Sequence, residues 1–320
     1  MSKDKCIFIA TIFVLTIVVF SININLSPDY YLYRSNWNNL ESIDYSEFSW
    51  SVLNLFSKNI FFDYNGFLFC ISFITIYFKF KYLKDLVKSN IILIFYTSSF
   101  LILHESIQIR LAFGLIFVLK SIKDSIDGKN YKGWLFLILA SSIHLSLLFF
   151  IIVKLLLIII KNKTVLIITV LSVIYFIDFI LQQNNIELMI NFFSEIGEKW
   201  SEKLSKYLYE FLELGIVKTP PLQIYYVGLI YLLNLILNFK KKVNKLNEIT
   251  LVSFILIIPV LMIPNDTITS RFIELCFYFL PFIQFKIYKE IYNQKLTPIS
   301  LTLLFLFFTL NFKIFTNQLI

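Results

Sequence analysis

The sequence has little charge, little glycine and little proline. Only 16% of its 320 residues are charged, and it contains seven glycines and seven prolines, whereas about a quarter of the residues in a soluble domain are charged. The composition is 58% hydrophobic with a mean hydropathy of +0.76. Apolar runs of about 15–20 residues, close to the length that crosses a bilayer, recur along the chain. The sequence therefore predicts an all-α polytopic membrane protein that forms a single integral membrane domain over residues 1–320.

Cysteine is also scarce. The three cysteines, Cys6, Cys70 and Cys276, lie in apolar stretches without paired spacing, which argues against a disulfide framework and a metal site. The sequence has no glycine-rich nucleotide loop and no nucleophile elbow, so we expect neither a metal nor a cofactor. Residues 6–22 follow basic residues and precede no small-residue cleavage site, which predicts an uncleaved signal anchor.

Lysine carries most of the positive charge. The net charge of +8 comes from 26 lysines and three arginines, and the lysines stand in short blocks between apolar runs. This is the positive-inside pattern of membrane proteins, so we expect no nucleic-acid partner. With every lysine block in the cytoplasm, the sequence predicts about eleven spans, a cytoplasmic N-terminus and an extracytoplasmic C-terminus. The expected spans are roughly 6–24, 60–79, 90–106, 108–121, 133–146, 147–160, 164–182, 222–239, 248–264, 271–287 and 297–315.

Two neighbouring spans, 133–146 and 147–160, are unusually short. One long helix there would invert the topology downstream, whereas two short helices keep every later lysine block inside. A helix of about 14 residues rises only about 21 Å, less than the ~30 Å hydrocarbon core. We therefore expect a turn below the outer surface near Ser141, Ser142 and His144.

Two predicted extracytoplasmic segments do not span the membrane, at about 23–59 and 183–221. Within the second, apolar residues recur every three or four positions over 188–213, and the opposite face carries Glu–Lys pairs spaced by four. This pattern predicts an amphipathic helix that lies on the outer membrane face or covers a site.

All three arginines, Arg34, Arg110 and Arg271, fall on the predicted outer side, which the positive-inside rule disfavours for basic residues. Because a guanidinium presents a planar fork of donors that matches phosphate, we interpret them as phosphate ligands. The alternative is a structural ion pair or an interfacial anchor, and for Arg110 that partner would be Glu105.

Both histidines also fall on the outer side. His144 lies in the middle of an apolar stretch, where a membrane location favours a role as a base or as a further phosphate donor, the alternative being a packing residue. His104 ends a span and is interpreted as interfacial.

The first outer segment combines carboxylates with aromatic rings. Aromatic rings pack on sugar faces and carboxylates bind hydroxyls, so this combination indicates a sugar site. The alternative is an aromatic belt at the membrane interface. The candidate residues are Asp29, Glu47, Tyr30, Tyr33 and Trp37.

These residues, in this order, resemble the EpsG family of bacterial exopolysaccharide proteins and the Wzy-type polysaccharide polymerases. The resemblance extends from about residue 28 to 290 and departs from the common pattern at Leu111, where glutamine is frequent, and at Phe48, where proline is frequent. The resembling pieces are Asp29-Tyr30 with Tyr33, Glu47 with Leu53-Asn54, 109–112, 140–144 and 270–272.

The resemblance implies a metal-independent glycosyltransferase of the bacterial cytoplasmic membrane. Such an enzyme moves a growing glycan from undecaprenyl pyrophosphate to an incoming lipid-linked repeat unit, in O-antigen, capsule or exopolysaccharide synthesis. By analogy it implies a GT-C-like helical architecture. Its partners would be undecaprenyl-pyrophosphate-linked glycans, membrane lipids, and chain-length regulator and flippase proteins.

On this interpretation the site residues take three roles. The pyrophosphate ligands are Arg110, Arg271 and Arg34, the catalytic residues are His144, Asp29 and Glu47, and the sugar-binding residues are Tyr30, Tyr33 and Trp37. Two other functions stay open: a flippase or transporter of lipid-linked sugars, and a membrane acyltransferase with His144 as its base.

Overall fold

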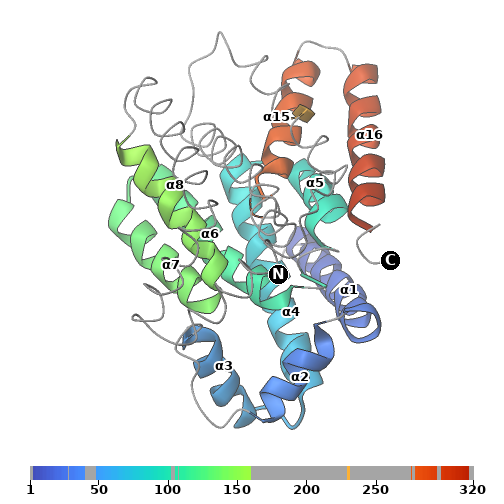
Figure 1. The fold of residues 1–320 in the computed structure, drawn as a ribbon. Coiled ribbons are helices and arrows are strands. Elements are labelled where there is room, and N and C mark those ends of the chain that lie inside the picture. Colours follow the sequence, from blue (N-terminus) through green and yellow to red (C-terminus); the bar gives the residue numbers. More distant parts are fainter. Residues whose placement is uncertain are drawn as a thin grey trace, which may run out of the picture. The chain divides into compact units, whose positions relative to one another are not determined.

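The computed structural model describes part of the chain. The described residues are 3–27, 29–39, 48–101, 105–106, 108–159, 229–230, 275, 278–293 and 297–316. Every element in these ranges is a helix, which confirms the all-α prediction for this part of the chain (Figure 1). Glu47, His104, Arg271, the segment 183–221 and most of the spans expected between 164 and 264 lie outside the described residues. The count of eleven spans stays a prediction.

The chain divides into two compact units. One comprises 1–151, 233–239 and 280–320, and the other comprises 152–232 and 240–279. The helices described below belong to the first unit, except that α8 begins there and continues into the second.

The helices of the described residues have the following bounds. They are α1 Lys3–Leu26, α2 Tyr30–Asn38, α3 Phe48–Lys58, α4 Tyr64–Val87, α5 Ile91–Phe100, α6 Ile109–Ile126, α7 Asn130–Ile143, α8 Leu148–Ile159, α15 Leu280–Asn293 and α16 Thr297–Thr316, with a short 3₁₀ helix at Leu145–Leu147. Two of them, over Cys6–Leu26 and Tyr64–Val87, are long and apolar enough to cross a membrane.

Helix α4 is the element around which the first unit is built, because it packs against α1, α2, α5 and α6. Its start is fixed by Asp63, whose side chain accepts a hydrogen bond from the Gly66 amide at 2.9 Å. Its end is fixed by Lys88, which adopts the left-handed conformation with φ 55°. The predicted span 60–79 is therefore corrected, since the helix continues to Val87 and contains Lys79, Lys81 and Lys84.

Helices α6 and α7 form an antiparallel hairpin. At one end, Gly114 lets the chains approach, because a Cβ atom there would lie 2.4 Å from Leu147 Cδ1 and 3.5 Å from the Ala140 carbonyl oxygen. At the other end, the Ser121 hydroxyl donates to the Gly133 carbonyl oxygen at 2.7 Å. The hairpin thus places residues near 110 on α6 at the level of residues near 144 on α7.

The helical run over 133–160 is broken at His144, as predicted. Helix α7 ends at Ile143, His144 is extended with φ −146° and ψ 120°, and the 3₁₀ turn and α8 follow. In the predicted span 90–106, the α-helical part, α5, ends at Phe100, and Leu101 and Glu105 are assigned to π-helix.

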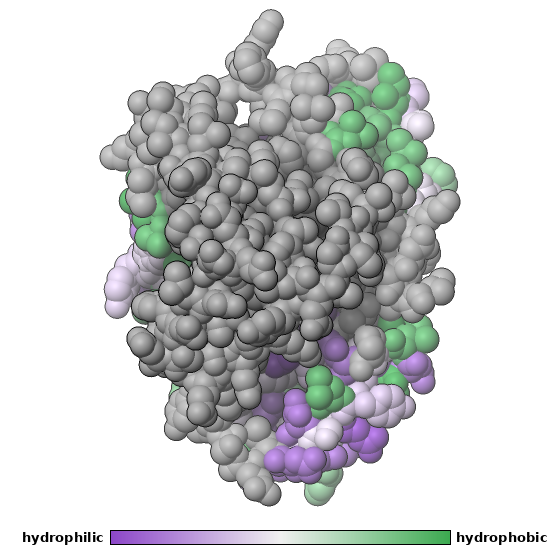
Figure 2. Space-filling view, viewed as in Figure 1, coloured by the Kyte–Doolittle hydropathy of each residue, from purple (hydrophilic) through white to green (hydrophobic). Residues whose placement is uncertain are grey.

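The outer surface of α16 is apolar. Its exposed side chains include Leu301, Phe305 and Leu306, and Phe305 is 71% exposed. Hydrophobic residues gather over α16 in Figure 2, whereas hydrophilic residues gather where α2 and α3 lie. An exposed apolar helix face is what contact with lipid requires.

Candidate functional site

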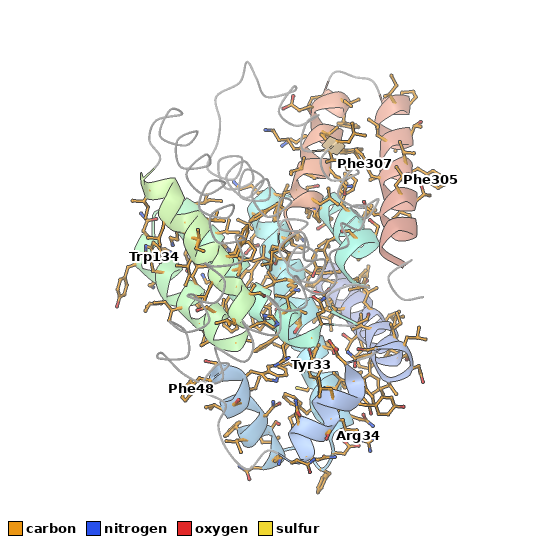
Figure 3. All side chains as sticks on the ribbon, viewed as in Figure 1. Tyr33, Arg34, Phe48, Trp134, Phe305 and Phe307 are labelled. Atoms are coloured by element: carbon orange, nitrogen blue, oxygen red, sulfur yellow. The ribbon has the colours of Figure 1, made fainter. Side chains whose placement is uncertain are left out.

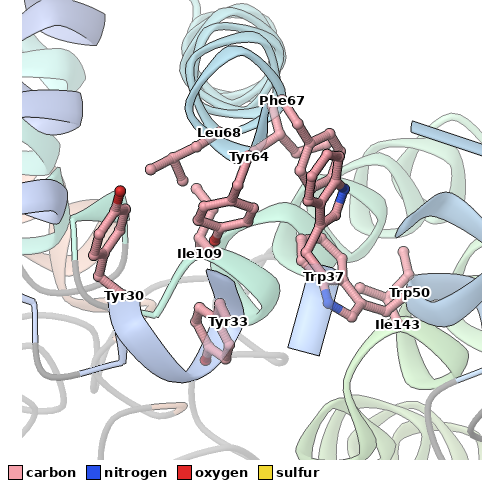
Figure 4. Close-up of a cluster of buried hydrophobic side chains, with 10 residues drawn as sticks. Tyr30, Tyr33, Trp37, Trp50, Tyr64, Phe67, Leu68, Ile109 and Ile143 are labelled. Carbon is pink, nitrogen blue, oxygen red and sulfur yellow. The ribbon is translucent and has the colours of Figure 1, made fainter. Parts of the chain in front are cut away.

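A cluster of buried aromatic rings joins α2, α3 and α4 to the start of α6. We call this set the aromatic cluster; its rings belong to Tyr30, Tyr33, Trp37, Trp50, Tyr64 and Phe67. Tyr30, Tyr33 and Trp37 follow one another at spacings of three and four, so they share one face of α2, and that face is buried. Figure 4 shows the Tyr64 ring between those of Tyr30 and Trp37.

The polar ends of two of these rings are satisfied inside the protein. The Tyr30 hydroxyl donates to Asn65 Oδ1 at 2.6 Å, and Trp37 Nε1 donates to the Ser57 hydroxyl at 2.7 Å. These bonds hold α2 against α4 and α3. In this structure the two rings pack within the protein, and their binding of a sugar stays a prediction.

Arg110 lies against the aromatic cluster. It is the second residue of α6 and is partly exposed. Its guanidinium carbon lies 4.7 Å from the centre of the Tyr33 ring, which is a cation–π contact. Such a contact holds the guanidinium against the ring face.

Tyr33 connects Arg110 to Asp29. Its hydroxyl donates to Asp29 Oδ2 at 3.3 Å. Burial raises the pKa of the Tyr33 hydroxyl, and the nearby Arg110 guanidinium opposes that rise. Tyr33 is therefore neutral at physiological pH, and it supports Arg110 through its ring face and not through a charge.

The start of α6 supplies further positive potential. The N-cap residue Gln108 makes no side-chain capping hydrogen bond to the first turn of the helix. The amides of a first helical turn point outward, and the helix dipole is positive at this end. Together with Arg110, the start of α6 has the properties of a site for an anion such as phosphate.

His144 lies at the same end of the hairpin as Arg110. Their chain neighbours, Ile143 and Ile109, both pack into the aromatic cluster. His144 Nδ1 lies 2.7 Å from the Ser146 hydroxyl and accepts from the Ser146 amide at 3.3 Å. Because an accepting Nδ1 carries no proton, the neutral ring carries its proton on Nε2. This geometry favours a hydrogen-bond donor over a base among the two roles predicted for His144.

Glu105 pairs with a residue other than Arg110. Glu105 Oε1 accepts hydrogen bonds from Lys79 Nζ and from the Tyr96 hydroxyl. The side chains of Lys79 and Glu105 are both completely buried. The alternative interpretation of Arg110 as the partner of Glu105 is therefore wrong, and Lys79 is an internal residue and not part of an exposed lysine block.

The chain was compared with known families, curated proteins and solved structures. The model of the EpsG family matches residues 6–319, which is nearly the whole chain. The chain belongs to the EpsG family. No curated protein and no solved structure matches it. EpsG membership and the apolar helices together indicate a membrane protein with a polysaccharide-polymerase type of function.

The other predicted site residues of this EpsG-family chain differ in their exposure, and two of them lie outside the described residues. Arg34 follows Tyr33 on α2 but is exposed, whereas Tyr33 is buried (Figure 3). Glu47 and Arg271 lie outside the described residues. The structure thus brings together Asp29, Tyr33 and Arg110, with His144 at the same end of the hairpin.

Sequence reasoning missed two features. Tyr64 belongs to the aromatic cluster, and its buried hydroxyl has no hydrogen-bond partner within the described ranges. The Lys79–Glu105 pair joins residues that are far apart in the sequence. No sequence signal distinguishes Tyr64 from the many other aromatic residues at the start of apolar runs.

Proposed function

We propose that this EpsG-family protein polymerises lipid-linked oligosaccharide repeat units at the outer face of the bacterial cytoplasmic membrane. In the proposed reaction, a hydroxyl of the incoming lipid-linked unit attacks the anomeric carbon of the growing glycan. The bond from that carbon to the pyrophosphate oxygen breaks, and a glycosidic bond forms. The hydroxyl proton passes to a base, and undecaprenyl pyrophosphate leaves with the bonding electron pair.

Arg110 is the observation that carries this proposal. It combines a guanidinium, an aromatic support and the positive end of α6 in one place. Negative charge develops on the pyrophosphate as it leaves, and positioned donors that meet this charge lower the barrier. Arginine can do this without a metal, because its fork offers two parallel donors to phosphate oxygens.

The remaining roles are proposals, supported for His144 by its place at the same end of the hairpin as Arg110 and for Asp29 by its hydrogen bond from Tyr33. His144, with its proton on Nε2, donates a hydrogen bond to the pyrophosphate beside Arg110. Asp29 accepts a hydrogen bond from Tyr33, whose ring contacts Arg110. Asp29 is one candidate for the base that takes the proton of the acceptor hydroxyl, and Glu47 is the other. Arg271 and Arg34 are proposed as further pyrophosphate ligands. The lipid-linked glycan, a flippase and a chain-length regulator are the proposed partners.

Replacing Arg110 by lysine tests the proposal in cells. Arg110→Lys keeps the charge and loses the planar fork, which typically costs about 2–4 kcal/mol of transition-state stabilisation, or roughly 30- to 1000-fold in rate. We expect surface glycans of one repeat unit in place of long chains, at unchanged protein abundance. Lys123→Arg, at the other end of the same helix, is the control for exchanging one basic residue for another. Cells with this variant should still make long surface glycans.

The same experiment separates the two other functions. Loss of a flippase would leave lipid-linked units inside the cell and remove even single units from the surface. Loss of an acyltransferase would keep chain length and change only the decoration of the glycan. Normal chain length with Arg110→Lys at normal abundance would contradict the polymerase proposal.

A further inference from the structure

Within the aromatic cluster, α2 and α4 contribute four rings that carry a polar group. Among the described residues, Tyr64 is the one of these four whose polar group makes no hydrogen bond. Tyr30, Tyr33 and Trp37 each donate a hydrogen bond to a neighbouring side chain. The Tyr64 residue is only 3% exposed, and its hydroxyl makes no hydrogen bond to any of the residues that the structure describes. A buried hydroxyl without a partner costs free energy, and such groups are rare in folded proteins.

The surroundings of this hydroxyl indicate what its partner is. Tyr64 belongs to the same buried cluster as Tyr33 and as Ile109, the residue before Arg110. Its ring lies 5.8 Å from that of Tyr30 and 6.1 Å from that of Trp37, measured between ring centres. Figure 4 shows Tyr33 below it on α2. Tyr64 thus shares a buried cluster with Tyr33, whose ring contacts the Arg110 guanidinium.

We propose that Tyr64 is a ligand of the pyrophosphate, donating its hydroxyl proton to a phosphate oxygen held by Arg110. This inference rests on the proposed function, which assigns the pyrophosphate to Arg110. A phenol hydroxyl is a donor at neutral pH, and a charged acceptor makes its hydrogen bond stronger. Arg110 is partly exposed, so an anion meets Arg110 at the surface and the buried Tyr64 hydroxyl completes its coordination.

The proposal also explains why the hydroxyl is retained. A phenylalanine would fill the same space between Tyr30 and Trp37 and would leave no unsatisfied atom. The hydroxyl therefore adds no hydrogen bond to the packing of the described helices. Its contribution comes when the phosphate is bound.

The test compares Tyr64→Phe with the wild-type full-length chain, purified in detergent, by titration with inorganic pyrophosphate. We expect the dissociation constant for pyrophosphate to rise about ten-fold, as for loss of one hydrogen bond to a charged group. Without pyrophosphate, the melting temperature should stay equal or rise, because a buried hydroxyl without a partner is removed. A purely structural role for Tyr64 predicts unchanged pyrophosphate affinity.

Tyr77→Phe is the matched control. Tyr77 lies on the same helix and its ring contacts Phe8 of α1, away from Arg110, so this variant should bind pyrophosphate as the wild type does. Arg110→Lys should weaken binding as well. Equal affinity of Tyr64→Phe and wild type, or no measurable binding by the wild type, would overturn the proposal for Tyr64.

The outcome is distinguishable from failure of the proposed function. If Tyr64→Phe weakens pyrophosphate binding while Arg110→Lys cells keep long glycans, the anion site stands and the polymerase is wrong. If Arg110→Lys cells make single-unit glycans while Tyr64→Phe binds pyrophosphate normally, the polymerase stands and the role of Tyr64 is wrong.

Discussion

Two polar regions lie along α4, and each contains a basic side chain. The surroundings of these two side chains, Arg110 and Lys79, differ. At the start of the helix, Tyr64 lies near Arg110, which is partly exposed and rests on the Tyr33 ring. About 22 Å farther along the axis, from the helical rise, Lys79 is completely buried and pairs with Glu105. Both cations lie over an aromatic ring, since Lys79 Nζ is 5.8 Å from the centre of the Tyr96 ring, but Lys79 is also paired with a buried carboxylate.

This difference separates a binding group from a structural one. A buried lysine next to a carboxylate has its charge neutralised, so it contributes little to the attraction of an external anion. A guanidinium on an aromatic face keeps its positive charge and its in-plane donors. The site for an anion is therefore expected at Arg110 and not at Lys79, although both are basic residues of the same helical unit.

Glu105→Gln should produce the largest loss of stability. It leaves the charge of Lys79 buried without a carboxylate, which typically costs about 3–5 kcal/mol. The double variant Lys79→Met/Glu105→Leu removes both charges and should recover most of that loss. Thermal unfolding of the purified chain in detergent measures both. Equal stability of Glu105→Gln and wild type would contradict the structural role assigned to the Lys79–Glu105 pair.

Asn311→Leu should have a smaller effect. Asn311 and Gln284 exchange two hydrogen bonds of 2.9 Å, and Asn311 also donates to the Ser98 hydroxyl at 3.1 Å, so the amide joins α16, α15 and α5. Its loss should cost about 1–2 kcal/mol. Thr309→Val, an exposed change on the same helix, should cost almost nothing. No difference between the two variants in thermal unfolding would show that this buried amide pair does not stabilise the helices.

Tyr33→Phe should have the smallest effect, and only at high pH. Because burial raises the pKa of Tyr33, the neutral hydroxyl is favoured in the folded state. Its contribution to stability is complete below the unfolded value of about 10 and is lost as the pH rises through the folded value. Wild type should therefore lose more stability than Tyr33→Phe above about pH 10. Parallel losses in alkaline unfolding would show that the Tyr33 hydroxyl does not titrate differently on folding.

Some of the site could be predicted from the sequence because the signal was local. Arg110 stands out as one of three arginines in the chain, and the break at His144 follows from polar residues within an apolar run too long for one ordinary span. In contrast, the pairing of Lys79 with Glu105 depends on where α5 ends, at Phe100. The sequence placed that end six residues later, and so it placed Glu105 at the outer surface.

The aromatic residues show a second reason why part of the candidate site could not be predicted from the sequence. Tyr30, Tyr33 and Trp37 were grouped from the sequence as rings near carboxylates, and the structure places them on one buried face of α2, whereas their binding of a sugar stays a prediction. Whether a ring is buried and whether its hydroxyl has a partner depend on the residues that meet it from other helices. Tyr30 and Tyr64 show this: Asn65 accepts from Tyr30, whereas no side chain in the described part of the chain accepts from Tyr64.

The most direct test of the account is the rate of glycan extension by purified protein in vesicles that contain the lipid-linked repeat unit. The rate is expressed per folded molecule for the wild type, for Arg110→Lys and for Lys79→Met/Glu105→Leu. We expect a fall of roughly 30- to 1000-fold for Arg110→Lys and a rate close to wild type for the double variant. The opposite order, with Arg110→Lys active and the double variant inactive at equal folded amount, would contradict it.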